Sequence, residues 1–419
     1  MSGAVQRLGS VAAAYGDVIR SRRYFPLWLG QLISNFGDTL HYIALVVLVF
    51  QLTGRGVAIA ALVAAEIVPV LLLGPVAGVI IDRFSRKRVL IAADLVRAAL
   101  ALSLVWPQGV WHPYLVAAGL SAGSTFFNPT VQAVIPVLTT EEQRLAANSV
   151  SWSSGRFVQI VASAVAGGLI GLVGTRPAFA LNTASFVASA LLITTLAIPP
   201  HAGQLGEGTR RGLANYAGDA WDGLSYALHD RFVSRLLLVQ SLASLAVGAT
   251  SALLVVLAER HLHLPASGFA WLIGAIGVGA LLGPLIPNTL ASDFRDARWL
   301  FVPYVIRGIG DVLLAVITQL PLALVILFVY GLNTSTGIVV FNSTIQGVVP
   351  DAVRGRTFTL LDISWNAARL LSLGLGGVLV DMVGIRAVYW IGGGLLAAAG
   401  VLGLALLGRY DFRGAERTL

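Results

Sequence analysis

Residues 127–136 read FNPTVQAVIP, and residues 341–350 read FNSTIQGVVP. Six of the ten positions are identical, and the two stretches lie 214 residues apart. A single match of this kind can arise by chance. Further matches at a similar separation would indicate that the chain consists of two homologous halves.

Such matches occur along most of the chain. At separations of 209 to 213 residues, the matched positions are Gln31 with Gln240, Leu73-Gly74-Pro75 with Leu282-Gly283-Pro284, Arg97 with Arg307, Arg176 with Arg386, Ser151-Trp152 with Ser364-Trp365, and Arg156 with Arg369. A nearly constant separation predicts two homologous six-helix bundles. Because six is an even number, both copies cross the membrane in the same direction, as parallel repeats about an axis along the membrane normal.

The composition excludes an ordinary soluble protein. Of the 419 residues, 57% are hydrophobic and 11% are charged, and the mean hydropathy is +0.82. Soluble domains carry about 25% charged residues. The chain has no cysteine, which excludes disulfides, thiolate metal sites and cysteine catalysis. The net charge of +8 does not by itself indicate a nucleic-acid partner, because the position of the basic residues along the chain decides their role.

Twelve apolar segments are long enough to cross roughly 30 Å of hydrocarbon as helices. They are 25–51, 57–81, 89–106, 111–136, 145–174, 177–198, 233–258, 265–290, 299–318, 321–349, 357–382 and 386–408. We therefore expect an all-α integral membrane protein with one six-helix bundle in residues 1–198 and a second in 233–419. Residues 199–232 are expected to form a cytoplasmic linker, in which apolar residues at helical spacing predict an interfacial amphipathic helix.

The distribution of lysine and arginine predicts the orientation. One set of alternating loops, together with both termini, holds 20 of the 28 basic residues, and the opposite set holds 4. Basic loops stay on the cytoplasmic side, so we expect both termini in the cytoplasm of a multi-pass protein of the cell (inner) membrane. The first apolar run is long and has no small-residue cleavage site, which favours a retained span over a signal peptide.

The loop after the second segment carries a motif that indicates a family. Residues 78–88 read GVIIDRFSRKR, which resembles the G-x-x-x-D-R-x-G-R-[RK] loop of the major facilitator superfamily. Ser85 stands where that family usually has glycine. Together with the twelve segments and the parallel repeat, the resemblance covers essentially the whole chain and implies the major facilitator fold. The equivalent loop near residues 287–298 lacks the Gly, the Asp and the first Arg, so the motif is asymmetric.

Three further stretches resemble the drug-exporter branch that includes macrolide-efflux and enterobactin-export proteins. They are LWLGQ at 27–31 with Gly37-Asp38, residues 69–78, and LAAN at 145–148. Exporters of this kind often carry G-P-x-x-G-G in the fifth span, where this chain has SAVAGG at 163–168. The glycines are kept and the Gly-Pro is not, which leaves facilitated transport open beside antiport.

The resemblance implies a secondary transporter and not an enzyme. The sequence has no H-E-x-x-H and no phosphate-binding G-x-x-x-x-G-K-[ST], so we expect no cofactor and a gradient as the energy source. With no Cys and two Met, a soft-metal transporter is not expected. The implied function is proton-coupled export of amphipathic small molecules, drug-like or siderophore-like, by alternating access. Facilitated or uptake transport and a lysophospholipid flippase of the same fold stay open. The expected partners are the small-molecule substrate, protons and the lipid bilayer, with no nucleic acid, and the chain is expected to be a monomer.

Ionisable residues inside the spans are candidates for energy coupling. At about 1.5 Å per residue, Asp38 and Glu66 both lie about 20 Å deep, near the middle of the membrane. No basic residue lies within a helical turn of Asp38. We therefore expect Asp38 to carry the transported proton and Glu66 to share it. Two pairs at i, i+3 and i, i+4 are expected to neutralise themselves on one helix face in a structural role, and these are Asp94–Arg97 and Arg307–Asp311.

The resemblance places the first, fourth, seventh and tenth spans around the substrate cavity. The cavity candidates are His41, Tyr42, Phe127, Asn128, Gln132, Trp152, Arg156, Asn333, Phe341, Asn342, Gln346, Trp365 and Arg369. Of these, Arg156 and Arg369 are predicted to face each other, and His41 either pairs with Asp38 or packs. The cytoplasmic gate candidates are Gly78, Asp82, Arg83, Arg86, Arg354 and Arg356. In this gate Asp82 is predicted to dock at the start of the eleventh span when the transporter faces outward.

Overall fold

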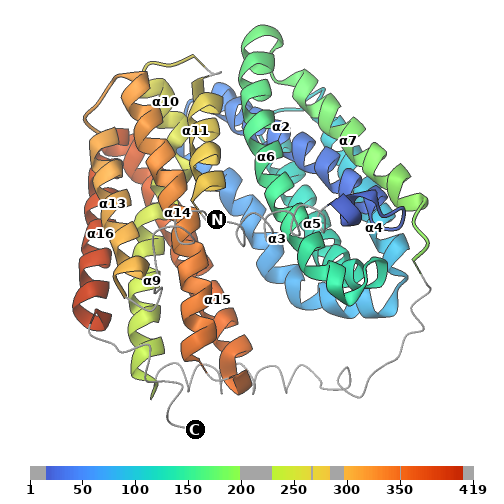
Figure 1. The fold of residues 1–419 in the computed structure, drawn as a ribbon. Helices are drawn as coiled ribbons and strands as arrows, with labels where there is room; N and C mark the ends of the chain where they lie inside the picture. The colour runs from blue at the N-terminus through green and yellow to red at the C-terminus, as the bar shows by residue number, and fades with distance from the viewer. Residues whose placement is uncertain (1–15, 199–228, 266–267, 284–296, 350, 409–419) are drawn as a thin grey trace, which may run out of the picture. The chain divides into compact units, whose positions relative to one another are not determined.

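The computed structural model of the chain describes residues 16–198, 229–265, 268–283, 297–349 and 351–408 (Figure 1). Within these ranges the regular structure is helical. The first-half helices are α2 (Phe25–Thr53), α3 (Gly56–Arg83), α4 (Arg86–Ser103), α5 (His112–Leu138), α6 (Glu141–Val173) and α7 (Arg176–Thr194). The second-half helices are α9 (Arg231–Ala252), α10 (Leu254–Arg260), α11 (Gly268–Leu282), α13 (Ala297–Leu314), α14 (Leu320–Val348), α15 (Asp351–Val383) and α16 (Ile385–Leu407).

The helices form two compact units. The first contains α2, most of α3 and α4 to α7, and the second contains α9 to α16. The start of α3, within residues 53–64, groups with the second unit although it directly follows α2. The linker predicted at 199–232 and its amphipathic helix fall almost wholly on residues 199–228, which lie outside the described residues.

Eight of the described helices are long and apolar enough to cross a membrane. They run over 25–53, 56–74, 146–173, 176–194, 231–252, 320–342, 357–383 and 385–407. A helix also lies at each of the four remaining predicted positions, in α4, α5, α11 and α13. The helix α4 is not apolar enough to count among the eight, because it begins with Arg86, Lys87 and Arg88 and contains the Asp94–Arg97 pair. The number of twelve spans therefore stays a prediction, and the predicted span 233–258 is broken at Leu253 into α9 and α10.

The internal repeat of the sequence is visible in the lengths of the helices. α6 and α15 each have 33 residues, and α4 and α13 each have 18. Each 33-residue helix stops at a glycine with positive φ, Gly174 at 83° and Gly384 at 86°. Because a residue without a Cβ adopts this conformation at little cost, both helices reverse into the next one within a residue or two.

Hydrogen bonds to serines at repeated positions join equivalent helices in the two units. In the first unit, Tyr24 at the start of α2 donates to the Ala147 carbonyl at 3.0 Å, and its hydroxyl lies 2.6 Å from Ser151 Oγ on α6. In the second unit, Ser241 Oγ on α9 lies 2.6 Å from Ser364 Oγ on α15. Ser151 and Ser364 are repeat partners, so the two halves share a fold as well as a sequence pattern.

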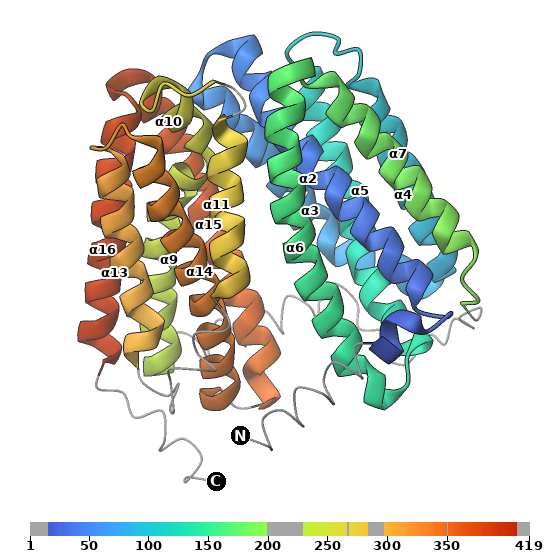
Figure 2. The ribbon, with the colours of Figure 1, turned by 45° about the horizontal axis from the view of Figure 1, so that its top comes forward.

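Glycines allow close helix packing in the second unit. α13 packs against α16, where a Cβ on Gly308 would lie 2.5 Å from the Gly393 carbonyl and one on Gly393 would lie 2.6 Å from the Gly308 carbonyl. The two helices lie side by side in both views (Figures 1 and 2). Small residues at such crossings are the usual means of helix association in membranes, where the hydrophobic effect between helices is weak.

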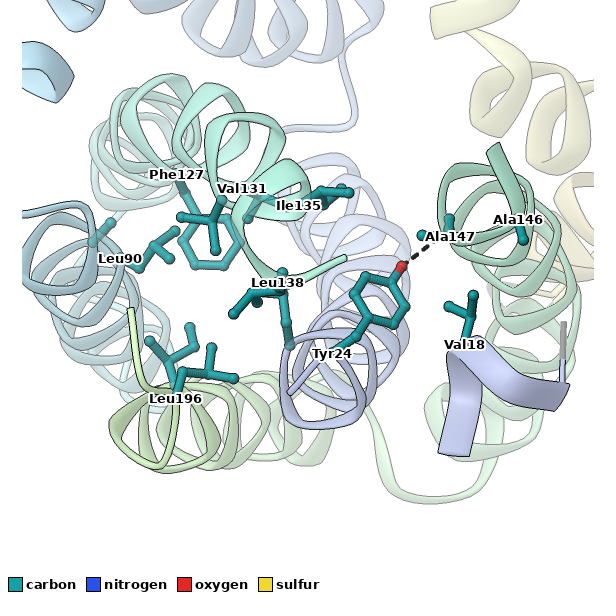
Figure 3. Packing of buried hydrophobic residues seen from close by; sticks show 14 residues of the cluster. Val18, Tyr24, Leu90, Phe127, Val131, Ile135, Leu138, Ala146, Ala147 and Leu196 are labelled. Carbon is teal, nitrogen blue, oxygen red and sulfur yellow. Dashed lines mark hydrogen bonds between the residues drawn. The ribbon is translucent and has the colours of Figure 1, made fainter. Parts of the chain in front are cut away.

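An apolar cluster closes one end of the first unit. Tyr24, Leu27, Val134 and Ile193 are at most 1% exposed and belong to it, together with neighbours from α4, α5 and α6. Figure 3 shows the Tyr24 ring among these side chains, with its hydroxyl reaching Ala147. The polar residues of α2 begin at Gln31, one turn after Leu27 of this cluster.

Candidate functional site

Four polar residues follow one face of α2. Gln31, Ser34, Asp38 and His41 recur at intervals of three and four residues, the spacing of a single helix face. Ser34 and His41 are 3% and 4% exposed, and Asp38 is half-buried. These side chains therefore point into the unit and not toward lipid.

The helix α7 presents a matching polar face to α2. Its residues Asn182, Ser185 and Ser189 have the same three- and four-residue spacing and are 0%, 5% and 0% exposed. A Cβ on Gly37 would lie 2.5 Å from Asn182 Oδ1, and one on Gly30 would lie 3.3 Å from Ser189 Oγ. The glycines of α2 thus let its backbone approach the polar residues of α7.

The helix α4 adds the charged pair Asp94–Arg97 to this region. The Arg97 guanidinium donates to Asp94, and Asp94 is 0% exposed. The guanidinium carbon also lies 4.2 Å from the centre of the Phe127 ring and 4.4 Å from that of Phe186. Asp38 is within electrostatic reach of the same guanidinium. One arginine therefore serves two carboxylates from two helices.

We call this set of residues the polar seam. It consists of Gln31, Ser34, Asp38, His41, Asp94, Arg97, Asn182, Ser185 and Ser189. Sequence spacing indicated the Asp94–Arg97 pair and gave it a structural role, but it did not bring Asp38 to Arg97, which lies 59 positions away on another helix. No lysine or arginine lies within a helical turn of Asp38 on α2, as expected, but Arg97 of α4 lies close to it in the folded unit.

His41 ends the polar face of α2. Its ring lies edge-on to Phe179, with centroids 5.0 Å apart, and neither ring nitrogen has a hydrogen-bond partner within the described part of the chain. Of the two roles left open for His41, the structure therefore favours packing over a direct pair with Asp38.

The second unit contains a cavity of about 380 Å³. Residues of α9, α13, α14 and α15 line it, and they include the aromatic side chains Tyr304, Phe341, Phe358 and Trp365. The polar lining residues include Gln240, Asn333, Asn342 and Asp362. Aromatic walls with a few polar groups are typical of sites that bind small organic molecules.

Hydrogen bonds hold two parts of the cavity wall. The Tyr304 hydroxyl donates to Gln240 Oε1, and the Asn333 amide donates to the Pro303 carbonyl. The Asn333 bond therefore ties α14 to α13 at Pro303, which lies inside that helix. Asp362 also lines the cavity, and its side chain is exposed there.

Arg307 also reaches the cavity, but its charge is engaged on another side. Its guanidinium donates to Ser251 Oγ at 2.8 Å and lies 4.0 Å from the centre of the Tyr330 ring. Asp311, one turn along α13, is 3% exposed and within electrostatic reach of Arg307. The predicted i, i+4 pair is thus arranged so that one carboxylate balances one guanidinium.

Four of the predicted cavity residues lie together around this cavity. They are Asn333, Phe341, Asn342 and Trp365. Phe127 lies in the apolar core at 3% exposure, whereas Asn128 and Gln132 on the same helix are exposed. Tyr42 is half-buried on α2 beside His41, and Arg369 is half-buried on α15, where its carbonyl packs against Gly248. Glu66 is half-buried on α3, and its carbonyl accepts a hydrogen bond from Ser121.

Several candidates lie outside the residues whose side chains the structure describes. In the cavity set they are Trp152, Arg156 and Gln346, and in the gate set Gly78, Asp82, Arg83, Arg354 and Arg356. The facing of Arg156 and Arg369 and the docking of Asp82 therefore stay predictions. Of the gate residues, Arg86 is described, and it donates to the Ala133 carbonyl at 3.0 Å, which ties the loop to α5.

The cavity residues that were missed in the sequence include Gln240, Tyr304, Phe358 and Asp362. Gln240 had a signal, since it is the repeat partner of Gln31. Asp362 also had one, because a carboxylate within a predicted span is a functional candidate by its position alone.

Residues 119–123, GLSAG, match a hydrolase pattern, but they lie inside α5 and not on the strand-to-helix turn that pattern requires.

Comparison with known proteins agrees with this architecture. A family model described as transmembrane secretion effector matches residues 17–411. Macrolide efflux protein A of Streptococcus pyogenes is 23% identical over 91% of this chain and 95% of its own. Multidrug efflux pump Tap of Mycobacterium tuberculosis is 25% identical over 87% of this chain and 88% of its own. The uncharacterized MFS-type transporter YfiS of Bacillus subtilis is 25% identical over 90% of this chain and 91% of its own.

Solved structures confirm the predicted fold class. The nucleoside transporter NupG matches 92% of this chain and 99% of its own with a TM-score of 0.77 at 15% identity. A bacterial homologue of the iron transporter ferroportin in an inward-facing state matches 92% of this chain and 98% of its own with a TM-score of 0.71 at 18% identity. At these identities the likeness concerns the fold, which is that of major facilitator transporters.

Proposed function

Because this chain belongs to the transmembrane secretion effector family of major facilitator transporters, we propose that it exports amphipathic small molecules by alternating access in exchange for protons. The names of two relatives, a macrolide efflux protein and a multidrug efflux pump, support export and a drug-like substrate. Membership of the family already identifies a multi-pass membrane transporter. The direction, the coupling ion and the substrate class are the parts that are proposed.

The observation that carries the proposal is the cavity of the second unit. Its wall combines Tyr304, Phe341, Phe358 and Trp365 with amide side chains and one carboxylate, Asp362. Aromatic faces attract cations through their quadrupole, and a carboxylate adds a charge-assisted contact. The other charged lining residue, Arg307, already faces Ser251, Tyr330 and Asp311. We therefore infer that the cavity selects amphipathic organic cations.

The proposed site of proton coupling is Asp38 in the first unit. It is half-buried on α2 and shares the Arg97 guanidinium with Asp94. Two carboxylates and one guanidinium carry one negative charge in excess, and binding of one proton removes that excess. A group that gains and loses a single charge in a packed helix bundle is suited to bias a conformational equilibrium.

The proposed orientation follows from the basic loops. We propose that both termini and the loop at 82–88 face the cytoplasm of the inner membrane, because 20 of the 28 basic residues fall on that side. A reporter fused after Leu419 should therefore score as cytoplasmic. A periplasmic score would overturn the proposed orientation.

The test is transport of ethidium, a permanent organic cation, into proteoliposomes that contain DNA as a fluorescent trap. Equal potassium on both sides with valinomycin holds the membrane potential at zero. An acidic lumen should drive ethidium inward, and liposomes without protein serve as the blank. Equal uptake with and without the pH gradient would establish facilitated diffusion instead. Movement of a labelled lysophospholipid, with none of ethidium, would establish a flippase.

A further inference from the structure

The polar seam contains most of the unpaired buried polar atoms of the described chain. Eleven buried side-chain nitrogen or oxygen atoms lack a hydrogen-bond partner among the described residues, and seven of them lie in the seam. The seven are Gln31 Oε1, His41 Nδ1, His41 Nε2, Asp94 Oδ2, Arg97 Nε, Asn182 Nδ2 and Ser189 Oγ. Buried polar groups in folded proteins are almost always hydrogen-bonded to protein or to ordered water. Their concentration between three helices points to water inside the seam.

Two of these atoms belong to residues that lie next to a carboxylate. The side chain of Asn182 interacts directly with Asp38, and that of Ser189 interacts directly with Asp94. Neither Asn182 Nδ2 nor Ser189 Oγ, however, has the geometry of a well-formed hydrogen bond to a described residue. Buried polar groups whose direct contact is poorly formed complete their hydrogen bonds through ordered water. The seam therefore has polar groups at the positions where waters would link α7 to both acids.

Apolar residues close the seam at each end. Toward the start of α2 lie Leu27 and Ile193, at 1% and 0% exposure, in the apolar cluster of Figure 3. At the other end Phe179, at 0% exposure, covers the ring of His41. Between these ends Asp38 is half-buried and Asp94 is fully buried. Asp38 is therefore the acid that a proton reaches first, and Asp94 is the acid behind it.

The charges of the seam balance with one proton. Asp38 interacts with Arg97 and Asp94 from α4, with Asn182 from α7 and with Ser34 from its own helix, and His41 lies one turn away. Asp38 and Asp94 with Arg97 sum to one negative charge, which is costly to bury. One bound proton makes the set neutral. The second unit differs, because Asp311 alone balances Arg307 and needs no proton.

We propose that the polar seam is a hydrated chamber in which one exchangeable proton is shared between Asp38 and Asp94, with Arg97 as the fixed counter-charge and Asn182 and Ser189 as the anchors of bridging water. This inference rests on the proton coupling proposed above and changes its site. The proton belongs to a set of two acids, and the Asp94–Arg97 pair is part of the coupling machinery as well as of the packing.

Infrared acid–base difference spectroscopy of the protein in proteoliposomes tests this without any substrate. A carboxylic acid has a carbonyl stretching band that a carboxylate lacks. A shared proton predicts that Asp38→Asn and Asp94→Asn each remove the same band, because the remaining carboxylate is then balanced by Arg97. A proton held by Asp38 alone predicts that only Asp38→Asn removes it. The band should be retained in Asp94→Glu, which keeps the charge and checks that loss in Asp94→Asn is not misfolding.

The serines of the first unit provide a matched pair for the water. Ser189→Ala should shift the band, because Ser189 interacts with Asp94 while its Oγ has no well-formed hydrogen bond to a described residue. Ser163→Ala should leave it unchanged, since Ser163 is equally buried at 0% exposure but donates to the Gln159 carbonyl of its own helix at 2.7 Å. Asp311→Asn should also leave the band unchanged.

Each outcome decides between distinct claims. A band of wild-type position and amplitude in Asp94→Asn overturns the shared proton while leaving Asp38 as the coupling residue. A band that survives in Asp38→Asn overturns the coupling role of Asp38 itself and so refutes part of the proposed function. No shift in Ser189→Ala overturns the bridging water.

Discussion

Replacement of Asp362 by Asn should change the charge preference of the cavity in the second unit. The side chain is exposed at the cavity, so its attraction to a bound cation is screened by water. At about 4 Å in a water-like dielectric this attraction is worth about 1 kcal/mol, which corresponds to roughly a fivefold change in Kd. The shape of the cavity is unchanged by Asn, so the effect should depend on the charge of the ligand and not on its size.

Tetraphenylphosphonium and tetraphenylborate provide this comparison, because they have nearly the same shape and opposite charge. Calorimetric titration of the purified protein, with protein-free micelles as the blank, should show weaker binding of the cation to Asp362→Asn and equal or tighter binding of the anion. Glu259→Gln is the matched control, since it removes an exposed carboxylate of the same unit that does not line the cavity. Equal weakening of both ions, or cation affinity within twofold of wild type, would refute the cation assignment.

Three further predictions concern packing. Gly308→Ala places a Cβ 2.5 Å from the Gly393 carbonyl and should cost about 1–3 kcal/mol, seen as a lower Tm in detergent, whereas Gly374→Ala, with nothing within 4 Å, should not lower it. Tyr24→Phe removes the bond to the Ala147 carbonyl and should cost about 1 kcal/mol in the same assay; an unchanged Tm would show that this bond adds nothing. Asp381→Ala removes the acceptor of the Gly56 and Val57 amides, at 3.0 and 3.2 Å, and should cost about 0.5–2 kcal/mol. Faster hydrogen exchange at the start of α3 would report it, and unchanged exchange there would contradict it.

The fold could be predicted from the sequence, because the pattern occurs twice and because lipid restricts the structure that long apolar segments can adopt. Long apolar segments must be helical in lipid, and the nearly constant separation between matches such as Arg97 and Arg307 predicts a duplicated bundle. The positions at which Phe341, Asn342 and Trp365 repeat first-half residues indicated cavity candidates, and these three lie around one cavity. Their role in transport stays a prediction.

The polar seam was not accessible in the same way. Spacing along one helix assigns Asp94 to Arg97, but it carries no information on which neighbouring helix faces that pair. The approach of α2 to α7 depends on Gly30 and Gly37, whose missing side chains give no signal until the packing is known. Asp362 was missed for a different reason, since it has no repeat partner of matching charge to single it out.

The most direct test of the central claim is ethidium accumulation driven by a pH gradient, compared between wild type and Asp38→Asn in the same proteoliposomes. The account predicts that the variant loses accumulation with an acidic lumen and still exchanges ethidium when both sides have the same pH, because the cavity lies in the other unit. Wild-type accumulation by Asp38→Asn would contradict proton coupling through Asp38.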